Sequence, residues 1–450
     1  MGLTTFATGL SGLNSNSQGL NVVGNNLANL NTTGYKASNI SFSEVLGQVF
    51  STPGTAQSGN LTHLGLGSQV AGIRAVFSQG GIQTSSNPLD VAIQGKGFLV
   101  VKDGGNQYFT RAGNMHLDAD GNLVAENGFN MQGYRRNATT GAVDPNLGLG
   151  DIAVPNGLMP PKSTSEFEVG MNLDAAADDG AKFTSTVQIF DTQGKAHLAT
   201  LSFQKEIGAT DAKWRFDVTI PNNEVAGVAS TDTQRYSLLT GAVATTPPAA
   251  GAFVFDSTGA LTSAYVGADP TVYPALADIS IPPSGGSMPA LANGASLDPT
   301  VWKLTSATGK VDITAYASPN EVTSSSQNGA AAGSLTSLAI QPDGTLVGVF
   351  SNGKTLNIAQ LALAQVSNLD GLVSHGQGLF TESRASGASH IGVPGEGGRG
   401  RLMSGALEQS NVDLASELTK IITFQRGYQA NARIITTTDQ ILQETMNLLR

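Results

Sequence analysis

The first thirty-five residues of the chain carry no charged side chain, and Lys36 is the first residue that does. Apolar residues in this stretch return in steps of three and four, which predicts an α-helix with one apolar stripe. Such a helix is marginally stable alone and needs a partner surface. The flanks of the stripe hold Asn, Ser, Gly and Thr, where an ordinary coiled coil has salt-bridging charges. The stripe consists of Leu3, Phe6, Leu10, Leu13, Ser17, Leu20, Gly24 and Leu27.

The end of the chain repeats this rhythm over five heptads. Ser410, Asn411 and Asp413 are N-cap candidates just before it, so we expect a helix of about 35 residues there. Its stripe consists of Leu414, Leu418, Ile421, Gln425, Tyr428, Ala432, Ile435, Asp439, Leu442, Met446 and Leu449.

The two stripes allow two kinds of partner. They can pair with each other inside one chain, as a coiled-coil stem, or they can pack against further copies of the chain. The pattern alone leaves both possibilities open. The missing charge favours assembly, because identical helices packed side by side bring like charges together at about 4 kcal/mol for 4 Å in an effective dielectric near 20. Asn, Ser and Thr avoid this repulsion and still form hydrogen bonds.

The middle of the chain, from about residue 70, has the pattern of strands joined by tight turns. Turns are predicted at 118–122 and 126–128, and the same Asp-to-Gly turn pattern recurs in three further segments. Asp and Gly suit such turns because they bond the turn backbone or adopt positive φ. We therefore expect mostly antiparallel β-structure. The further segments read FDTQGKAHL, FVFDSTGAL and AIQPDGTLV.

Pro- and Gly-rich stretches at 137–167, 316–334 and 383–405 suggest where domains meet. The predicted fold class is mainly β central domains, antiparallel and nested by insertion, with long α-helical N- and C-terminal segments that form a coiled-coil stem. The predicted parts are a terminal helical core of 1–70 and 405–450, an inner β domain of 71–150 and 335–404, and an outer β domain of 151–334.

Composition excludes several classes of protein. The formal net charge of −10 argues against a nucleic-acid partner, because no basic stripe exists to neutralise phosphates. The absence of Cys excludes disulfides and thiolate metal sites. No run of eighteen apolar residues occurs, so we expect no membrane insertion. The N-terminus lacks the pattern of a cleaved secretory signal.

Motifs for catalysis or cofactor binding are weak. The G-x-G-x-x-G match at 395–400 lies in a connector, and the stretch at 118–122 lacks the glycine position and the twelfth-position Glu of a calcium loop. The five His form no H-x-x-x-H pair, and no G-x-S-x-G elbow occurs. We predict no catalytic, metal or cofactor site, and no enzyme. Gly34 and Tyr35 follow the first helix, where we expect a Gly C-cap with a hydrophobic contact.

Several stretches resemble the axial proteins of the bacterial flagellum, the rod and hook family. The N-terminal NNLANLNTTGYK resembles the signature of that family, and SQGGIQTSSNPLDVAIQGKGFLVV resembles its inner domain. STVQIFDTQGKAHLATLSFQK resembles the outer domain of the hook type. The last 45 residues complete the match, which covers nearly the whole chain except for differences around 221–320. Length and the inserted outer domain favour the hook type over the shorter rod type.

The resemblance implies a self-assembling structural subunit of the hook, a flexible curved tube that passes motor torque to the filament. Implied partners are further copies of the chain, the rod, hook cap, hook–filament junction and hook-length control proteins, and the type III export apparatus. It implies an extracellular location in the flagellar basal body and hook, and export without a cleaved signal peptide. A distal rod protein, or a secreted β-rich adhesin or glycan-active enzyme, is the alternative.

The terminal helices are the expected assembly interface. The residues assigned to it are Leu3, Phe6, Leu10, Leu13, Leu20, Leu27, Asn29, Gly34, Tyr35, Leu414, Leu418, Ile421, Tyr428, Asn431, Ile435, Leu442, Met446 and Leu449.

Overall fold

The computed structural model of the chain forms two compact units, each assembled from segments that are distant in the sequence. Unit 1 comprises Met1–Asn156, Ser337–Gly348 and Thr355–Arg450, and unit 2 comprises Gly157–Thr336 and Val349–Lys354. The further division of unit 1 into a helical core and an inner β domain stays a prediction. The structure describes residues 2–45, 48–50, 62–137, 141–155, 158–207, 212–228, 234–244, 248, 250–267, 270, 272–283, 286–305 and 310–448.

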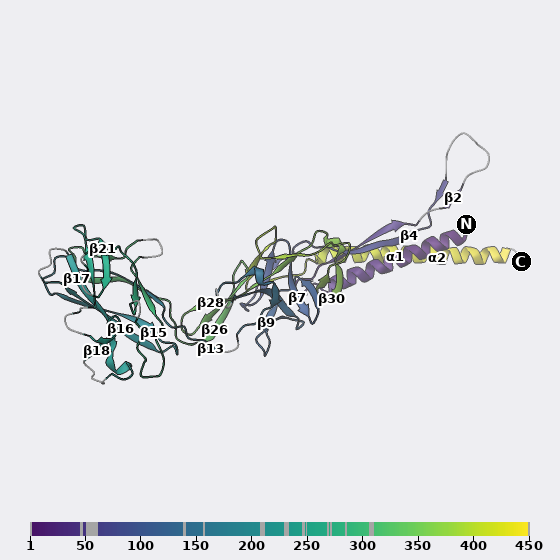
Figure 1. Cartoon of the computed structure of the whole chain (residues 1–450). Helices are drawn as coiled ribbons and strands as arrows, with labels where there is room; N and C mark the ends of the chain where they lie inside the picture. Colours follow the sequence, from purple (N-terminus) through teal and green to yellow (C-terminus); the bar gives the residue numbers. More distant parts are fainter. Residues whose placement is uncertain are drawn as a thin grey trace. The chain divides into compact units, whose positions relative to one another are not determined.

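The fold is mostly β, and the α-helices of the described residues lie at the two ends of the chain (Figure 1). The helices are α1 (Gly2–Ala28) and α2 (Leu414–Leu448). The elements before the inserted unit are β1 (Ser38–Glu44), β2 (Gln48–Phe50), β3 (Thr62–Leu64), β4 (Ser68–Ala75), β5 (Ile82–Thr84), β6 (Val91–Gln94), β7 (Phe98–Asp103), β8 (Asn106–Thr110), β9 (Met115–Leu117), β10 (Leu123–Ala125), β11 (Asn130–Arg135), η1 (Pro145–Leu147) and β12 (Leu149–Asp151). The elements after it are β26 (Gly333–Ile340), β27 (Thr345–Phe350), β28 (Thr355–Leu361), β29 (Leu363–Gln365), η3 (Leu369–Gly371), β30 (Val373–Gly376), β31 (Leu379–Thr381), β32 (His390–Gly392), β33 (Arg401–Ser404) and β34 (Ala406–Glu408).

In unit 1, strands from before and after the insertion form one sheet. Strand β7 pairs antiparallel with β8, β11 and β29, so that Leu99 lies opposite both Thr110 and Leu363. In two separate two-stranded sheets, β6 pairs with β33 and β5 pairs with β34. Apolar runs in these strands are buried on both faces, as the continuous pattern of β7 requires. One core cluster contains Phe98, Val100, Phe109, Ala364 and Phe380.

Unit 2 has an aromatic core between two sheets. Trp302 from one sheet lies edge-on against Phe216 and Phe253 from the other, with ring centroids 5.5 and 5.4 Å apart. Large aromatic side chains supply much of the apolar area that stabilises such a core. The elements of this unit are β13 (Leu158–Met159), β14 (Glu166–Asn172), β15 (Lys182–Phe190), β16 (Ala196–Lys205), β17 (Ala212–Pro221), η2 (Asn222–Glu224), β18 (Arg235–Ser237), β19 (Ala242–Val243), β20 (Gly251–Phe255), β21 (Leu261–Val266), β22 (Ile279–Ile281), β23 (Thr300–Lys303), β24 (Ile313–Thr314) and β25 (Glu321–Gln327).

The predicted Asp-to-Gly turns form in both units. In each, the aspartate carboxylate accepts a hydrogen bond from the backbone N–H two residues on. The glycine of each turn has φ between 82° and 85°, which only Gly adopts at little cost. These turns connect antiparallel neighbours. The pairs are Asp118 with Gly121, Asp191 with Gly194, Asp256 with Gly259, and Asp343 with Gly344.

The two helices pack against each other in opposite directions, with the N- and C-termini at the same end of the pair (Figure 1). Asp413 caps α2, because its carboxylate accepts from the backbone N–H of Ser416 at 2.9 Å. A methyl group built on Gly9 would lie 3.2 Å from Ile435, and one built on Gly19 would lie 3.0 Å from the ring of Phe424. Glycine at these two positions of α1 lets the two backbones approach closely.

The predicted coiled-coil stem is wrong. The helices span 27 and 35 residues and do not interlock through the predicted apolar stripes. The row of α1 that contacts α2 is displaced by one residue from the leucine stripe, and Leu10 is 51% exposed. Phe424 of α2 also packs edge-on against Phe42 of β1, with ring centroids 6.0 Å apart. Helix α1 thus packs on both α2 and the β1–β4 ribbon, and glycine rather than leucine faces the partner helix.

The buried side chain of His197 joins three parts of unit 2. Its Nε2 lies 3.1 Å from the carboxylate of Asp191, and its Nδ1 lies 2.8 Å from that of Glu224. A carboxylate thus lies within hydrogen-bond distance of each ring nitrogen. Burial alone would raise the pKa of the Asp191 carboxyl, but hydrogen bonds from His197, Asn293 and two backbone amides outweigh it and hold that pKa below its ordinary value.

We predict that Asp191→Asn destabilises unit 2 by roughly 1–3 kcal/mol at pH 7, because His197 loses an ionised partner. A depressed carboxyl pKa gives stability that is present above the unfolded pKa and is lost as the pH falls through the folded one. The difference in melting temperature between wild type and variant should therefore narrow from pH 7 to pH 3 in calorimetry. The exposed Asp178→Asn is the matched control, and a difference that stays constant with pH would contradict this role.

Candidate functional site

A buried asparagine ties the two helices to the start of the β-structure. Asn26 is fully buried, and its Nδ2 donates to Glu417 Oε2 at 3.1 Å and to the carbonyl of Ser38 at 2.8 Å. Its Oδ1 accepts from the Ser38 amide and from the hydroxyl of Tyr35. Glu417 also forms an ion pair with Lys420 at 2.6 Å. One side chain thus connects α1, α2 and the first residue of β1.

A buried carboxylate joins segments from opposite ends of the chain. Glu408 lies between Lys36 and Arg111, with nitrogen–oxygen distances of 2.6 and 3.1 Å. Its Oε1 also accepts from the backbone N–H of Gly80 at 3.0 Å. Lys36 donates further to the carbonyl of Ser78, and Arg111 donates to that of Gly95. The Arg111 guanidinium also lies over the ring of Phe98, at 5.3 Å.

Glu408 influences the pKa values of both Lys36 and Arg111. Burial lowers the pKa of Lys36, and the hydrogen bond and negative charge of Glu408 act in the opposite direction. Burial likewise lowers the pKa of Arg111, again opposed by Glu408. Buried ions are tolerated when they are paired and their remaining hydrogen-bonding groups are satisfied. The cluster is therefore a specific joint whose loss leaves uncompensated charge.

Gly34 closes the connection between α1 and this cluster. Its N–H donates to the backbone carbonyl of Glu408 at 2.7 Å, and its φ is 69°. A methyl group there would lie 2.5 Å from the backbone nitrogen of Ala112. The predicted C-cap role of Gly34 is wrong, because α1 already ends at Ala28 and the Gly34 amide bonds to the returning chain.

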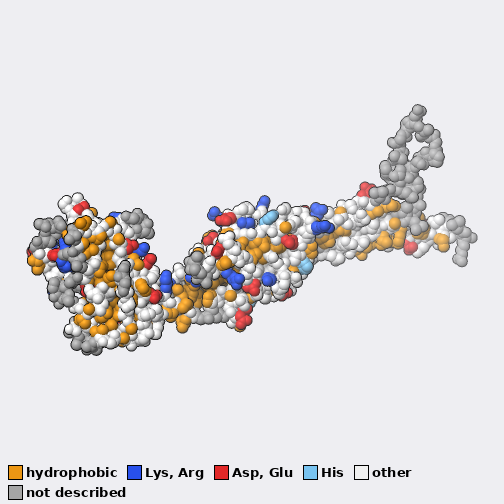
Figure 2. Space-filling model, in the orientation of Figure 1, with side chains coloured by type: hydrophobic (Ala, Val, Ile, Leu, Met, Phe, Trp, Pro, Cys, Tyr) orange, Lys and Arg blue, Asp and Glu red, His pale blue; other side chains and the backbone are white. Residues whose placement is uncertain are grey.

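The predicted interface residues fall into three groups. Leu13, Leu20, Leu27, Asn29, Tyr35, Ile421, Asn431 and Ile435 are half-buried, and Gly34 is buried. Phe6, Leu10, Leu414, Leu418, Tyr428, Leu442 and Met446 are exposed. The side chain of Leu3 and the whole of Leu449 lie outside the described residues. The structure brings Asn431 and Ile435 against α1, and it leaves the exposed group at the surface of the helix pair, where Figure 2 shows hydrophobic side chains.

The buried polar joint escaped the sequence analysis. The residues missed are Asn26, Lys36, Arg111, Glu408 and Glu417. Lys36 offered the strongest signal, since it is the first charge after a long neutral stretch. Its partner could not be inferred, because Glu408 lies 372 positions further along the chain.

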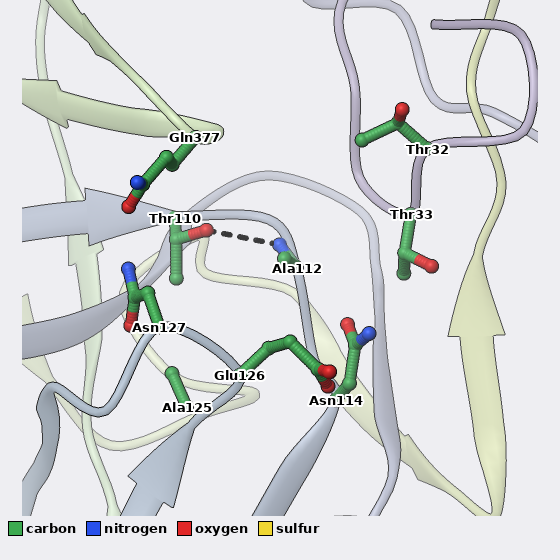
Figure 3. Close-up of a pocket in the computed structure, with 9 residues that line it drawn as sticks. All are labelled: Thr32, Thr33, Thr110, Ala112, Asn114, Ala125, Glu126, Asn127 and Gln377. Atoms are coloured by element: carbon green, nitrogen blue, oxygen red, sulfur yellow. Dashed lines mark hydrogen bonds between the residues drawn. The ribbon is translucent and has the colours of Figure 1, made fainter.

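A cavity of about 390 Å³ lies beside this joint (Figure 3). Thr32 and Thr33 line one side, facing Asn114 and Glu126, and the hydroxyl of Thr110 accepts from the Ala112 N–H at 3.1 Å. The cavity lining consists mainly of neutral polar side chains, with Glu126 as the one carboxylate among the described lining residues. Within the described ranges, no three His, Asp or Glu side chains are grouped to hold a metal ion. Neither helix, over its described length, is long and apolar enough to span a membrane.

We predict that Glu408→Gln destabilises unit 1 by about 3–5 kcal/mol, because Lys36 and Arg111 stay buried without a counter-charge. Chemical denaturation, monitored by far-UV circular dichroism, measures this loss of stability. Glu396→Gln, at an exposed position of the same unit, is the control and should change stability by no more than about 0.5 kcal/mol. Equal losses in the two variants would show that the cluster has no special role.

Four family models match the chain in order along its length. They are described as flagella basal body rod protein (residues 6–36), flagellar hook protein FlgE/F/G D1 domain (92–172), flagellar basal body protein FlaE D2 domain (159–330) and flagellar basal body rod FlgEFG protein C-terminal (403–448). The first and last models cover the two helices and the residues that join them to the sheet.

Curated relatives match over nearly the whole chain. The flagellar hook protein FlgE of Treponema pallidum is 33% identical, over 91% of this chain and 92% of its own length. That of Escherichia coli is 31% identical, over 91% and 94% respectively. A crystal structure of Helicobacter pylori flagellar hook protein FlgE2 covers 73% of this chain and all of its own, with a TM-score of 0.51 and 13% identity, and supports the fold alone. This chain belongs to the flagellar hook protein family.

Proposed function

We propose that this protein is the structural subunit of the bacterial flagellar hook. In this role it assembles with copies of itself into a flexible, curved helical tube that transmits motor torque to the filament. The observation that carries the proposal is the exposed apolar surface of the helix pair, which the chain itself leaves uncovered. A concentration of exposed large apolar side chains on two helices favours a surface that further protein covers.

This surface, which we call the outer stripe, consists of large apolar side chains on both helices. Leu10 is 51% exposed, Leu418 is 44% exposed and Met446 is 72% exposed. Helix α1 has no charge that could repel an identical neighbour. The outer stripe supports assembly through the terminal helices. Its members are Phe6, Leu10, Leu414, Leu418, Ile422, Tyr428, Ile434, Ile441, Leu442 and Met446.

A bending tube needs two kinds of contact. Every line of subunits must lengthen and shorten once per turn, so the inner contacts must hold while the outer contacts slide. Large apolar contacts of the helices suit the first purpose. Small, polar, hydrated contacts between β surfaces suit the second, because bridging water replaces lost hydrogen bonds. A chain with only 13% charged residues has few ion pairs to break during such sliding.

The proposed role implies partners and a location for the protein. The subunit would contact the rod, the hook cap, the hook–filament junction proteins and the hook-length control protein, after passage through the type III export apparatus. It would act outside the cell, in the hook of the flagellum, and without enzymatic activity. The paired chain ends support this role, because family models for rod-type proteins match at those two segments.

We predict that Leu10→Lys and Leu418→Lys each reduce polymer yield at least tenfold, because a charge in the outer stripe meets its own copy on the neighbour. The melting temperature of the monomer should change by no more than about 3 °C, since both positions are exposed. Sedimentation and negative-stain electron microscopy measure the polymer. Leu198→Lys is the matched control, at a 57% exposed leucine of unit 2, and it should assemble normally.

Normal polymers from both helix variants would refute assembly through the outer stripe. The shape of the wild-type polymer is a separate readout. A curved, flexible tube supports the hook role, whereas a straight, stiff tube would assign the chain to the distal rod instead.

A further inference from the structure

Each terminal helix carries the pattern Gly-x-x-x-Asn on the face toward the other helix. In α1 it is formed by Gly12 and Asn16, and in α2 by Gly427 and Asn431. Because the helices run in opposite directions, the two patterns meet reciprocally. Asn431 lies over Gly12, and Asn16 lies over Gly427. Two asparagines are thus placed over two glycines at one level of the pair.

The fit between these side chains is close. A methyl group built on Gly12 would lie 2.7 Å from Nδ2 and 2.8 Å from Oδ1 of Asn431. One built on Gly427 would lie 2.7 Å from Oδ1 of Asn16. Asn16 is held in place because its Nδ2 donates to the backbone carbonyl of Gly12 at 2.7 Å. A Cβ atom at either glycine would therefore require the facing asparagine side chain to move.

The leucine stripe of α1 begins one position after this row, so Leu10 and Leu13 follow Gly9 and Gly12 directly. One residue corresponds to about 100° of rotation about the helix axis. Rotating α1 by that amount would bury the leucines against α2, which the hydrophobic effect favours. The observed orientation instead places glycine inside and leaves Leu10 half exposed. Asn26 near the end of α1 and Ser15, which donates to the Ser68 carbonyl at 3.0 Å, oppose this rotation. The contacts with α2 at Gly12 and Asn16 add a third restraint.

We infer that the two reciprocal Asn–Gly contacts are a rotational lock, which keeps the leucine stripe of α1 turned away from its own α2 and free for a neighbouring copy. A rotation of α1 would carry Asn16 off Gly427 and would place the bulkier Leu13, in the position of Gly12, opposite Asn431. With the lock in place, the chain buries less apolar surface within itself, and its outer surface has a defined arrangement. Polar residues in helix seams are known to set geometry at some cost in stability. The purpose of the lock rests on the proposed function, but its existence does not.

The test measures the exposure of residue 10 in dilute monomer. The chain has no Cys, so Leu10→Cys introduces a single thiol whose rate of alkylation reports its accessibility. In this background, the lock is removed with Asn16→Ala and Asn431→Ala, which create no steric conflict. Alkylation should slow at least fivefold, because α1 rotates and buries position 10. Asn14→Ala with Asn447→Ala is the matched control, at two exposed asparagines of the same helices, and should leave the rate unchanged.

Other outcomes would overturn the lock. An unchanged rate means that the asparagines do not set the orientation of α1, and a faster rate with lost helicity in circular dichroism means that they only hold the helix in place. A slower rate that depends on protein concentration would place the contact between copies rather than within one chain. None of these results depends on polymer formation, so failure of the lock and failure of the hook role remain distinguishable.

Discussion

The structure depends on one carboxylate, that of Glu408, held between Lys36 and Arg111 at the point where the two ends of the chain meet. A buried ion pair adds little net stability, because desolvating the charges offsets much of their attraction. Its value is geometric. Glu408 is satisfied only when the segment after α1, the end of β8 and the strand before α2 are all in place. Each terminal helix therefore leaves the β-structure from a defined position. Asn26 acts in the same way, because it joins α1 to α2 and to the start of β1.

Because the helices start from fixed positions, their pairing decides what they show to other molecules. Glycines of α1 at the seam let the two backbones approach closely and pack on large side chains of α2, such as Phe424 and Ile435. Other large apolar side chains, among them Leu10 and Leu418, remain exposed. The proposed contacts between chains would therefore use a different face of the helix from the contacts within the chain. In an ordinary coiled coil the leucines are buried between the paired helices, so they are not available for contacts with other chains.

Periodicity and turn chemistry predicted part of this architecture well. The Asp413 cap, the extent of α2 and the Asp-to-Gly turns follow from local rules, since the residues that form them are neighbours in the sequence. The seam was assigned to the wrong face because hydrophobic periodicity finds the most apolar stripe. Glycine contributes nothing to that signal, yet it allows the closest packing. The joint around Glu408 was missed for a different reason: its members are hundreds of positions apart, and pattern within a segment says nothing about such pairs.

The nested chain path explains how a long insertion leaves the paired ends undisturbed. Strands from before and after unit 2 hydrogen-bond directly, as β7 does with β29 and β6 with β33, so the two parts of unit 1 are joined through backbone pairing. Unit 2 in turn closes around its own aromatic core of Trp214, Trp302 and Phe253. Two separate cores allow the inserted unit to differ in size and surface while the joint and the helix seam keep their geometry. Sequence differences should therefore be rare at Gly12, Gly34 and Glu408, where close contacts fix the residue.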